Sequence, residues 1–216
     1  MTRRARPKAV LFDWDNTLVD TWPIIVECYR DTFVALGRDP WTSDEVKARA
    51  HGSLRDLFPA LFGGEAVRAE QVFYETFHRI HLERLAPLPG AAAVVERLAG
   101  EGLLVGVVSN KVGDNLRTEV AHLGWSRWLN PVIGARDARR DKPAPDPILM
   151  ALAGSGIAPA ECWMVGDTPA DLASAKAAGC QRVLVGGPDR LPDSFVEYEP
   201  LLRARDCHAL MALLWE

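Results

Sequence analysis

Residues 8–21 read Lys8-Ala9-Val10-Leu11-Phe12-Asp13-Trp14-Asp15-Asn16-Thr17-Leu18-Val19-Asp20-Thr21. The apolar run from Ala9 to Phe12 is too short for a helix and is typical of a buried strand in a parallel sheet. Asp13 and Asp15 follow directly, at the strand end where open α/β sheets bind ligands. Carboxylates this close repel each other unless a cation or a shared proton intervenes, so the pair favours a Mg²⁺ site. An Asp-rich turn is the alternative explanation.

The composition is that of an ordinary globular protein. The chain has 216 residues, of which 48% are apolar and 25% charged, which suits one good-sized domain or a domain with an insert. The net charge of −4 argues against non-specific binding to nucleic acid. No apolar signal region follows the basic segment at residues 2–8, so we expect neither a secretory signal nor a membrane span. Widely spaced cysteines favour reduced thiols and a cytoplasmic protein; they are Cys28, Cys162, Cys180 and Cys207.

The pattern of apolar residues changes from strand to helix after residue 21. Helical spacing, a capping-box signature from Thr42 to Glu45 and the absence of a strand signal predict a block of helices up to about residue 85. The segment Pro87-Leu88-Pro89-Gly90 then interrupts the pattern. We therefore expect residues 21–86 to form one all-helical domain.

Strands and helices alternate after this interruption. We expect strands at residues 103–108, 131–135, 162–165 and 182–185, and helices at residues 91–99, 114–123, 146–153, 169–178 and 208–215. Such alternation predicts an α/β fold in which a parallel sheet carries helices on both faces. Residues 1–20 and 87–216 would form this core, and the helical domain would be an insert that caps the strand ends.

Two further segments carry residues suited to phosphate chemistry. Ser109 and Asn110 follow the strand at 103–108, where a hydroxyl and backbone N–H groups can hold a phosphate oxygen, although a turn would also explain them. Lys142 lies in a proline-rich loop at residues 141–147, where the stiffened backbone aims its side chain. A lysine between a carboxylate nucleophile and a phosphate would neutralise both, whereas most lysines are merely exposed.

Another pair of carboxylates lies beyond the strand at 162–165. Asp167 follows this strand, and Asp171 lies in the first turn of the helix at 169–178, in the string Gly-Asp-x-x-x-Asp. Helix capping by Asp167 and a favourable interaction of Asp171 with the helix dipole are the alternative explanations. The string is the most specific pattern after the first one.

Four motifs in this order resemble those of the haloacid dehalogenase superfamily. Phe-Asp-x-Asp-Asn-Thr-Leu at 12–18 is similar to the first motif, Ser109-Asn110 to the second, Lys-Pro-x-Pro at 142–145 to the third, and Gly-Asp-x-x-x-Asp at 166–171 to the fourth. The Asn-Lys pair at 110–111 resembles phosphoglycolate-phosphatase-like members with a helical cap, although these more often carry Thr before it. The resemblance spans the whole chain.

The resemblance implies a Rossmann-like core, a helical cap and a Mg²⁺-dependent phosphatase. Such an enzyme hydrolyses a small phosphomonoester, such as phosphoglycolate, through an aspartyl-phosphate. Asp13 would be the nucleophile, Asp15 the general acid and base, and Lys142 the residue that shields charge between nucleophile and phosphoryl group. The implied metal ligands are Asp13, Asp15 through its backbone carbonyl, Asp167 and, as an outer ligand or orienter, Asp171. The implied phosphate-binding residues are Ser109, Asn110, Thr17 and Lys142. The substrate of such an enzyme would be a small phosphorylated metabolite, and the protein would be a monomer or a homodimer.

Other functions use a similar set of residues. A phosphomutase of the beta-phosphoglucomutase type needs the same Asp13 and Asp15 but has a cap that excludes water and binds a second phosphate. A pyrophosphatase is a further alternative function. A non-catalytic binder of phosphorylated ligands is disfavoured because it would need neither Asp15 nor a metal. A dehalogenase is disfavoured because it would lack an aspartate at the position of Asp15. Arg55, in the cap segment 51–55, is the candidate to bind an anionic substrate group. Its alternative explanation is an exposed helix residue paired with Asp56.

Overall fold

The computed structural model describes residues 6–50, 54–186 and 197–215. Contacts between residues divide the chain into two compact units, the first made of Met1–Val19 with Pro87–Glu216 and the second of Asp20–Ala86. Two short strands, β2 (Val19–Asp20) and β3 (Ala86–Pro87), lie where the chain passes from one unit to the other, and they pair with each other.

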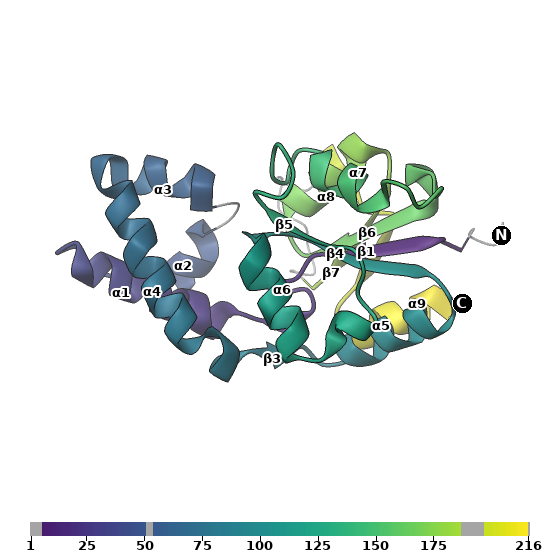
Figure 1. The fold of residues 1–216 in the computed structure, drawn as a ribbon, viewed down its shortest axis with the longest axis horizontal. Helices are drawn as coiled ribbons and strands as arrows, with labels where there is room; N and C mark the ends of the chain where they lie inside the picture. Colours follow the sequence, from purple (N-terminus) through teal and green to yellow (C-terminus); the bar gives the residue numbers. More distant parts are fainter. Residues whose placement is uncertain (1–5, 51–53, 187–196, 216) are drawn as a thin grey trace. The chain divides into compact units, whose positions relative to one another are not determined.

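A parallel sheet is the centre of the first unit (Figure 1). In the described residues it has six strands in the order β5-β4-β1-β6-β7-β8. The bounds are β1 (Ala9–Phe12), β4 (Leu104–Val112), β5 (Val132–Ala135), β6 (Cys162–Gly166), β7 (Gln181–Val185) and β8 (Leu202–Ala204). Every residue of β1 is buried, which explains why this strand is apolar without alternation.

The strand register brings the polar motifs to one edge of the sheet. Phe12, the last residue of β1, pairs with Val107 on β4 and with Val165 on β6. The backbone N–H of Asp13 then donates to the carbonyl oxygen of Val165 at 2.8 Å. Because the strands are parallel, the residues that follow each pairing lie together at the carboxyl end of the sheet, where ligands bind in open α/β folds.

Helices cover both faces of the sheet. Figure 1 shows α7 (Asp146–Leu152) and α8 (Pro169–Ala178) on one face, and α5 (Ala91–Gly100), α6 (Gly113–His122) and α9 (Cys207–Trp215) on the other. Short 3₁₀ turns precede two of the strands, η2 (Trp125–Arg127) before β5 and η3 (Pro159–Glu161) before β6. The core under α7 and α8 consists of small and aliphatic side chains, among them Leu11, Val108, Ile148, Met164 and Ala175.

The second unit is helical and has its own core. Its helices are α1 (Trp22–Ala35), α2 (Ser43–Arg49), α3 (Leu54–Phe62) and α4 (Ala66–Arg84), with the 3₁₀ turn η1 (Gly63–Glu65) before α4. Thr42 caps α2 reciprocally with Glu45, so the predicted capping box is confirmed. The core is rich in aromatic rings in edge-on contact, which stabilises it beyond burial alone. Its buried rings are Tyr29, Phe33, Phe58, Phe62, Phe73 and Phe77.

The predicted fold class, a parallel α/β sheet with helices on both faces, is confirmed, and three details differ from the sequence prediction. β4 continues to Val112 rather than ending at residue 108, with a shift in its pairing to β5 between Val108 and Val112. β8 was not predicted, because its three residues include the exposed Arg203 and give no apolar run. The strands β2 and β3 were not predicted either, because two residues are too few for a strand pattern; the segment 21–86 was expected to be all helical, and Ala86 lies in β3.

The four cysteines are free and buried, as expected for reduced thiols. None of the helices in the described part of the chain is long and apolar enough to cross a membrane. The cytoplasmic location, the lack of nucleic-acid binding and the oligomeric state stay predictions.

Candidate active site

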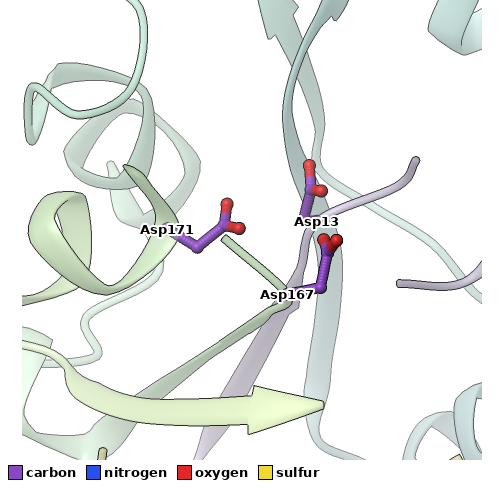
Figure 2. Close-up of side chains that lie close together, drawn as sticks. All are labelled: Asp13, Asp167 and Asp171. Atoms are coloured by element: carbon purple, nitrogen blue, oxygen red, sulfur yellow. The ribbon is translucent and has the colours of Figure 1, made fainter. Parts of the chain in front are cut away.

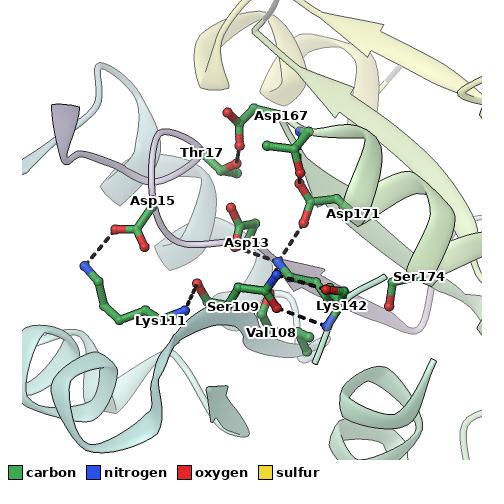
Figure 3. Close-up of polar contacts among 12 residues, drawn as sticks. Asp13, Asp15, Thr17, Val108, Ser109, Lys111, Lys142, Asp167, Asp171 and Ser174 are labelled. Atoms are coloured by element: carbon green, nitrogen blue, oxygen red, sulfur yellow. Dashed lines mark hydrogen bonds and ion pairs between the residues drawn. The ribbon is translucent and has the colours of Figure 1, made fainter. Parts of the chain in front are cut away.

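The Asp13 carboxylate lies at the carboxyl end of β1 beside a buried lysine. Lys142 Nζ donates to Asp13 Oδ1 at 2.7 Å, to Asp171 Oδ1 at 2.6 Å and to the carbonyl oxygen of Val108 at 2.7 Å (Figure 3). Asp13 is only 6% exposed and Lys142 only 3% exposed. The lysine is therefore not an ordinary surface residue, because its three N–H donors connect Asp13 after β1, Val108 within β4 and the first turn of α8.

Three carboxylates converge at this point. Oxygen atoms of Asp13, Asp167 and Asp171 all lie within 4.8 Å of one another, and Figure 2 shows the three side chains pointing toward a common centre. Thr17 Oγ1 donates to Asp167 Oδ1 at 2.9 Å, so the loop after β1 is connected to the end of β6. Thr17 thus holds a proposed metal ligand rather than pointing away from the site.

The electrostatics of the cluster fit a divalent cation. Burial raises the pKa of Asp13 to about 7; Lys142 opposes this shift, while the charges of Asp171 and Asp15 add to it. Burial, together with repulsion from Asp13 and Asp171, raises the pKa of Asp167 well above its ordinary value. The three carboxylates, when ionised, carry more negative charge than the single ammonium group of Lys142 can neutralise. A divalent cation would supply the missing positive charge, and Mg²⁺ prefers oxygen ligands of this kind.

Both oxygens of Asp171 already accept hydrogen bonds. Asp171 Oδ2 accepts from the backbone N–H of Thr168 at 2.9 Å and from its hydroxyl at 2.6 Å, which makes Thr168 rather than Asp167 the N-cap of α8. Its Oδ1 accepts from Lys142. Gly166 leaves room for this carboxylate, since a Cβ there would lie 2.3 Å from Asp171 Cγ. Asp171 therefore connects Lys142 to the N-terminal turn of α8.

Asn110 is hydrogen bonded to the backbone of the lysine. Its side-chain amide donates to the carbonyl oxygen of Lys142, and its oxygen accepts from the N–H of Lys142, both at 3.0 Å. Ser174 Oγ on α8 donates to the carbonyl oxygen of Ala144 at 2.7 Å and holds the other end of the loop. The loop is thus fixed by side chains of β4 and α8, in addition to its prolines. Ser109, the residue before Asn110 in β4, is buried.

Substitution of Asn110 by Ala is expected to lower kcat about tenfold to a hundredfold with little change in KM. The reason is that loss of both bonds lets the Lys142 backbone shift, and small shifts of a charged catalytic group are costly. Asn110→Asp keeps the acceptor and is expected to lose less. Steady-state kinetics on both variants check this; a raised KM with unchanged kcat would instead place Asn110 in contact with the substrate.

The Asp15 side chain points to a different partner from Asp13. Lys111 Nζ lies 2.7 Å from Asp15 Oδ1 (Figure 3). It also lies 2.6 Å from Glu119 Oε2 on α6. Burial lowers the pKa of Lys111, but the charges of Asp15 and Glu119 outweigh it and hold the pKa above its ordinary value. Lys111 belongs to the Asn-Lys pair that carries part of the resemblance, but no role was predicted for its side chain, and Glu119 was not predicted to lie at the site. The one available signal was the position of Lys111 directly after the Ser-Asn motif.

Arg55 lies in the second unit. It is exposed in the first turn of α3, and residues 51–53 of the predicted cap loop lie outside the described residues. The structure thus brings together Asp13, Asp15, Thr17, Ser109, Asn110, Lys142, Asp167 and Asp171 in the first unit. The role of Arg55 stays a prediction.

The fold and the acidic site agree with one class of protein, the hydrolases of the haloacid dehalogenase type. The family model described as haloacid dehalogenase-like hydrolase matches residues 10–185, most of the chain. The chain belongs to the haloacid dehalogenase-like hydrolase family.

Curated relatives carry the names of phosphatases. The N-acetylmuramic acid 6-phosphate phosphatase of Pseudomonas aeruginosa is 29% identical over 188 residues, which cover 85% of this chain and 83% of the relative. The phosphoglycolate phosphatase of Aquifex aeolicus is 30% identical over 181 residues, with 82% and 84% covered. The crystal structure of a haloacid dehalogenase-like hydrolase from Bacteroides fragilis has the same fold, with a TM-score of 0.86, 22% identity, and 95% and 100% of the chains covered. The predicted family and the predicted class of enzyme, a phosphatase, are confirmed.

Proposed function

We propose that the protein is a Mg²⁺-dependent phosphatase that hydrolyses a small phosphomonoester, similar to phosphoglycolate, through an aspartyl-phosphate on Asp13. The observation that carries the proposal is the buried Asp13 carboxylate at 2.7 Å from Lys142 Nζ, beside the carboxylates of Asp167 and Asp171. The names of the two relatives, both phosphatases of small phosphate esters, support this class of substrate.

The chemistry proceeds in two steps on the side chains of the first unit. In the first step, an Asp13 oxygen attacks phosphorus while the bond from phosphorus to the ester oxygen breaks, and protonated Asp15 gives its proton to the leaving alcohol. In the second step, Asp15 takes a proton from water, the water oxygen attacks phosphorus, and the bond to Asp13 breaks. Inorganic phosphate leaves, and both carboxyl groups return to their starting states. Lys142 offsets the negative charge on Asp13 and on the phosphoryl oxygens in both steps.

The proposed metal ligands are Asp13, Asp167 and the backbone carbonyl of Asp15. Mg²⁺, when bound there, neutralises the repulsion between the Asp13 carboxylate and the phosphoryl group. Asp171 is proposed as the orienter of Lys142, since its two oxygens already accept hydrogen bonds. Ser109, in β4 next to Val108, is the proposed ligand of a phosphoryl oxygen.

A screen of phosphomonoesters with Mg²⁺, in which released inorganic phosphate is counted, tests the proposal. The panel includes phosphoglycolate, sugar phosphates, nucleotides, inorganic pyrophosphate and nitrophenyl phosphate. We expect release from at least one small alkyl phosphate. Conversion of one sugar phosphate into its isomer without release would indicate a mutase, and no release from any compound would contradict the proposed function.

We propose that the second unit is a cap that selects the leaving group. This is supported by the segregation of the residues: the predicted phosphate-chemistry motifs at residues 12–18, 109–110, 142–145 and 166–171 all lie in the first unit, whereas the described part of Asp20–Ala86 contributes helices around its own aromatic core and two strand ends, in β2 and β3. A cap of this kind excludes bulk water while the core performs the chemistry.

If Arg55 reads an anionic group of the substrate, Arg55→Ala is expected to raise KM for that substrate. One charge-assisted hydrogen bond is worth about 1.5–3 kcal/mol, so KM should rise about tenfold to a hundredfold. Hydrolysis of nitrophenyl phosphate should change little. Arg68→Ala, another exposed arginine of the second unit, is the matched control. Equal and small effects on both substrates would remove Arg55 from substrate recognition.

A further inference from the structure

Asp15 is held in place by a buried set of charged groups that extends away from the metal-binding carboxylates. Lys111 Nζ bridges Asp15 Oδ1 at 2.7 Å and Glu119 Oε2 at 2.6 Å, and the side chain of Lys111 is only 8% exposed. Trp14 Nε1 donates to the same oxygen of Glu119 at 2.6 Å. These four residues come from the loop after β1, from β4 and from α6.

The two groups behind Asp15 are rigidly held. Glu119 and Trp14 are both fully buried, and Trp14 packs edge-on against Trp125 with ring centroids 5.7 Å apart. A buried carboxylate is costly unless its charge is paired and its oxygens are hydrogen bonded, and Lys111 and Trp14 supply Glu119 with an ion pair and with hydrogen bonds. Lys111 therefore has little freedom to leave its place between the two carboxylates.

We propose that Lys111 and Glu119 are positioning residues that hold the Asp15 carboxyl group in line for its proton transfers, an inference that rests on the proposed function. An ammonium group donates to an acceptor oxygen of the carboxyl in both of its protonation states. The position of Asp15 is thus preserved while its proton goes to the ester oxygen and is later replaced from water. Proton transfer requires hydrogen-bond geometry, and a loosely held carboxyl would lose much of its contribution.

The dependence of the rate on the leaving group separates this role from a merely structural one. An alkoxide needs a proton as it leaves, whereas nitrophenolate is a weak base and leaves without one. The ratio kcat/KM includes all steps up to formation of the aspartyl-phosphate, so it reports the proton transfer to the leaving group. Variants are measured with nitrophenyl phosphate and with the alkyl phosphomonoester that the parent protein hydrolyses fastest.

Lys111→Met is expected to lower the ratio of kcat/KM for the alkyl phosphate to kcat/KM for nitrophenyl phosphate by about tenfold or more, because a general acid contributes about 10²–10⁴-fold. Glu119→Gln keeps the lysine and weakens its anchor, so the same ratio should fall by less. The matched control is Lys8→Met, which removes an exposed lysine paired with Glu161 at 2.6 Å and should leave the ratio unchanged.

Two results would overturn the proposal. If Lys111→Met lowers kcat/KM equally for both substrates, so that their ratio is unchanged, Lys111 supports only the structure of the site. If Lys111→Met does not fold, the variants Trp14→Phe and Glu119→Gln decide the question, because both keep Lys111 and weaken the contacts that hold it. If both variants fold and the ratio of kcat/KM values for the two substrates is unchanged in both, the proposal is overturned as well. A parent protein that hydrolyses neither substrate contradicts the proposed function itself, whereas an active parent with unchanged ratios contradicts only the role of Lys111 and Glu119.

Discussion

Asp13→Asn is expected to lose phosphate release by about 10³-fold or more while the protein stays folded. A carboxamide is a poor nucleophile toward phosphorus, and loss of a nucleophile is among the most severe changes that an enzyme suffers. The amide oxygen can still accept the hydrogen bond from Lys142, which also keeps its bond to Asp171. The substitution removes one of three mutually repelling carboxylates that lie close together, so Tm should not fall.

The measurement combines released phosphate with the thermal unfolding midpoint. Asp114→Asn is the matched control, because the side chain of Asp114 is 94% exposed in the same unit and should change neither quantity. Acid-quenched parent protein should carry a labelled phosphoryl group after brief exposure to labelled substrate, and Asp13→Asn should carry none. If Asp13→Asn turns over substrate within a few-fold of the parent protein, the assignment of Asp13 as the nucleophile is wrong.

Removal of divalent cations by a chelator is expected to abolish activity, and added Mg²⁺ is expected to restore it. Asp167→Asn should then raise the Mg²⁺ concentration that gives half of the maximal activity by at least about tenfold, since a charged ligand is lost. The amide oxygen can still accept the hydrogen bond from Thr17, so the variant changes charge rather than shape.

Thermal stability gives an independent measure of metal binding. A ligand that binds only the folded state raises Tm by an amount that grows with the logarithm of its concentration above its Kd, so Mg²⁺ should raise the Tm of the parent protein and of Asp114→Asn. It should have little effect on the Tm of Asp167→Asn. Full activity in the presence of the chelator would contradict the proposed metal dependence, whatever the behaviour of Tm.

The proximity of the main site residues could be predicted from the sequence, because it follows from the order and direction of the strands. Asp13 and Asp167 each follow an apolar strand, and the carboxyl ends of neighbouring parallel strands necessarily meet. The network behind Asp15 was not accessible in this way. Trp14 and Glu119 are 105 residues apart in the chain, and a glutamate on an amphipathic helix gives no signal of its own burial.

The local roles of single residues were also beyond a sequence pattern. Asn110 was predicted to bind phosphate from its motif, but whether an amide faces a ligand or a neighbouring backbone depends on the side-chain rotamer and on a loop 32 residues away. The same holds for Asp171, since a carboxylate in the first turn of a helix can cap it, bind metal or hold a lysine. Its bonds to Thr168 and Lys142 become visible only in three dimensions.

The pairing of β2 with β3 has a consequence for redesign of the protein. The segment Asp20–Ala86 leaves the first unit through β2 and returns through β3, so its two ends are adjacent strands of one small sheet. Insertions whose ends lie close together are tolerated because they do not disturb the host register. Since this segment also carries its own aromatic core, it forms a natural cassette. If the second unit selects the leaving group as proposed, exchange of the cassette between related chains at these two strands is expected to transfer selectivity, while Asp13, Lys142, Asp167 and Asp171 are unchanged.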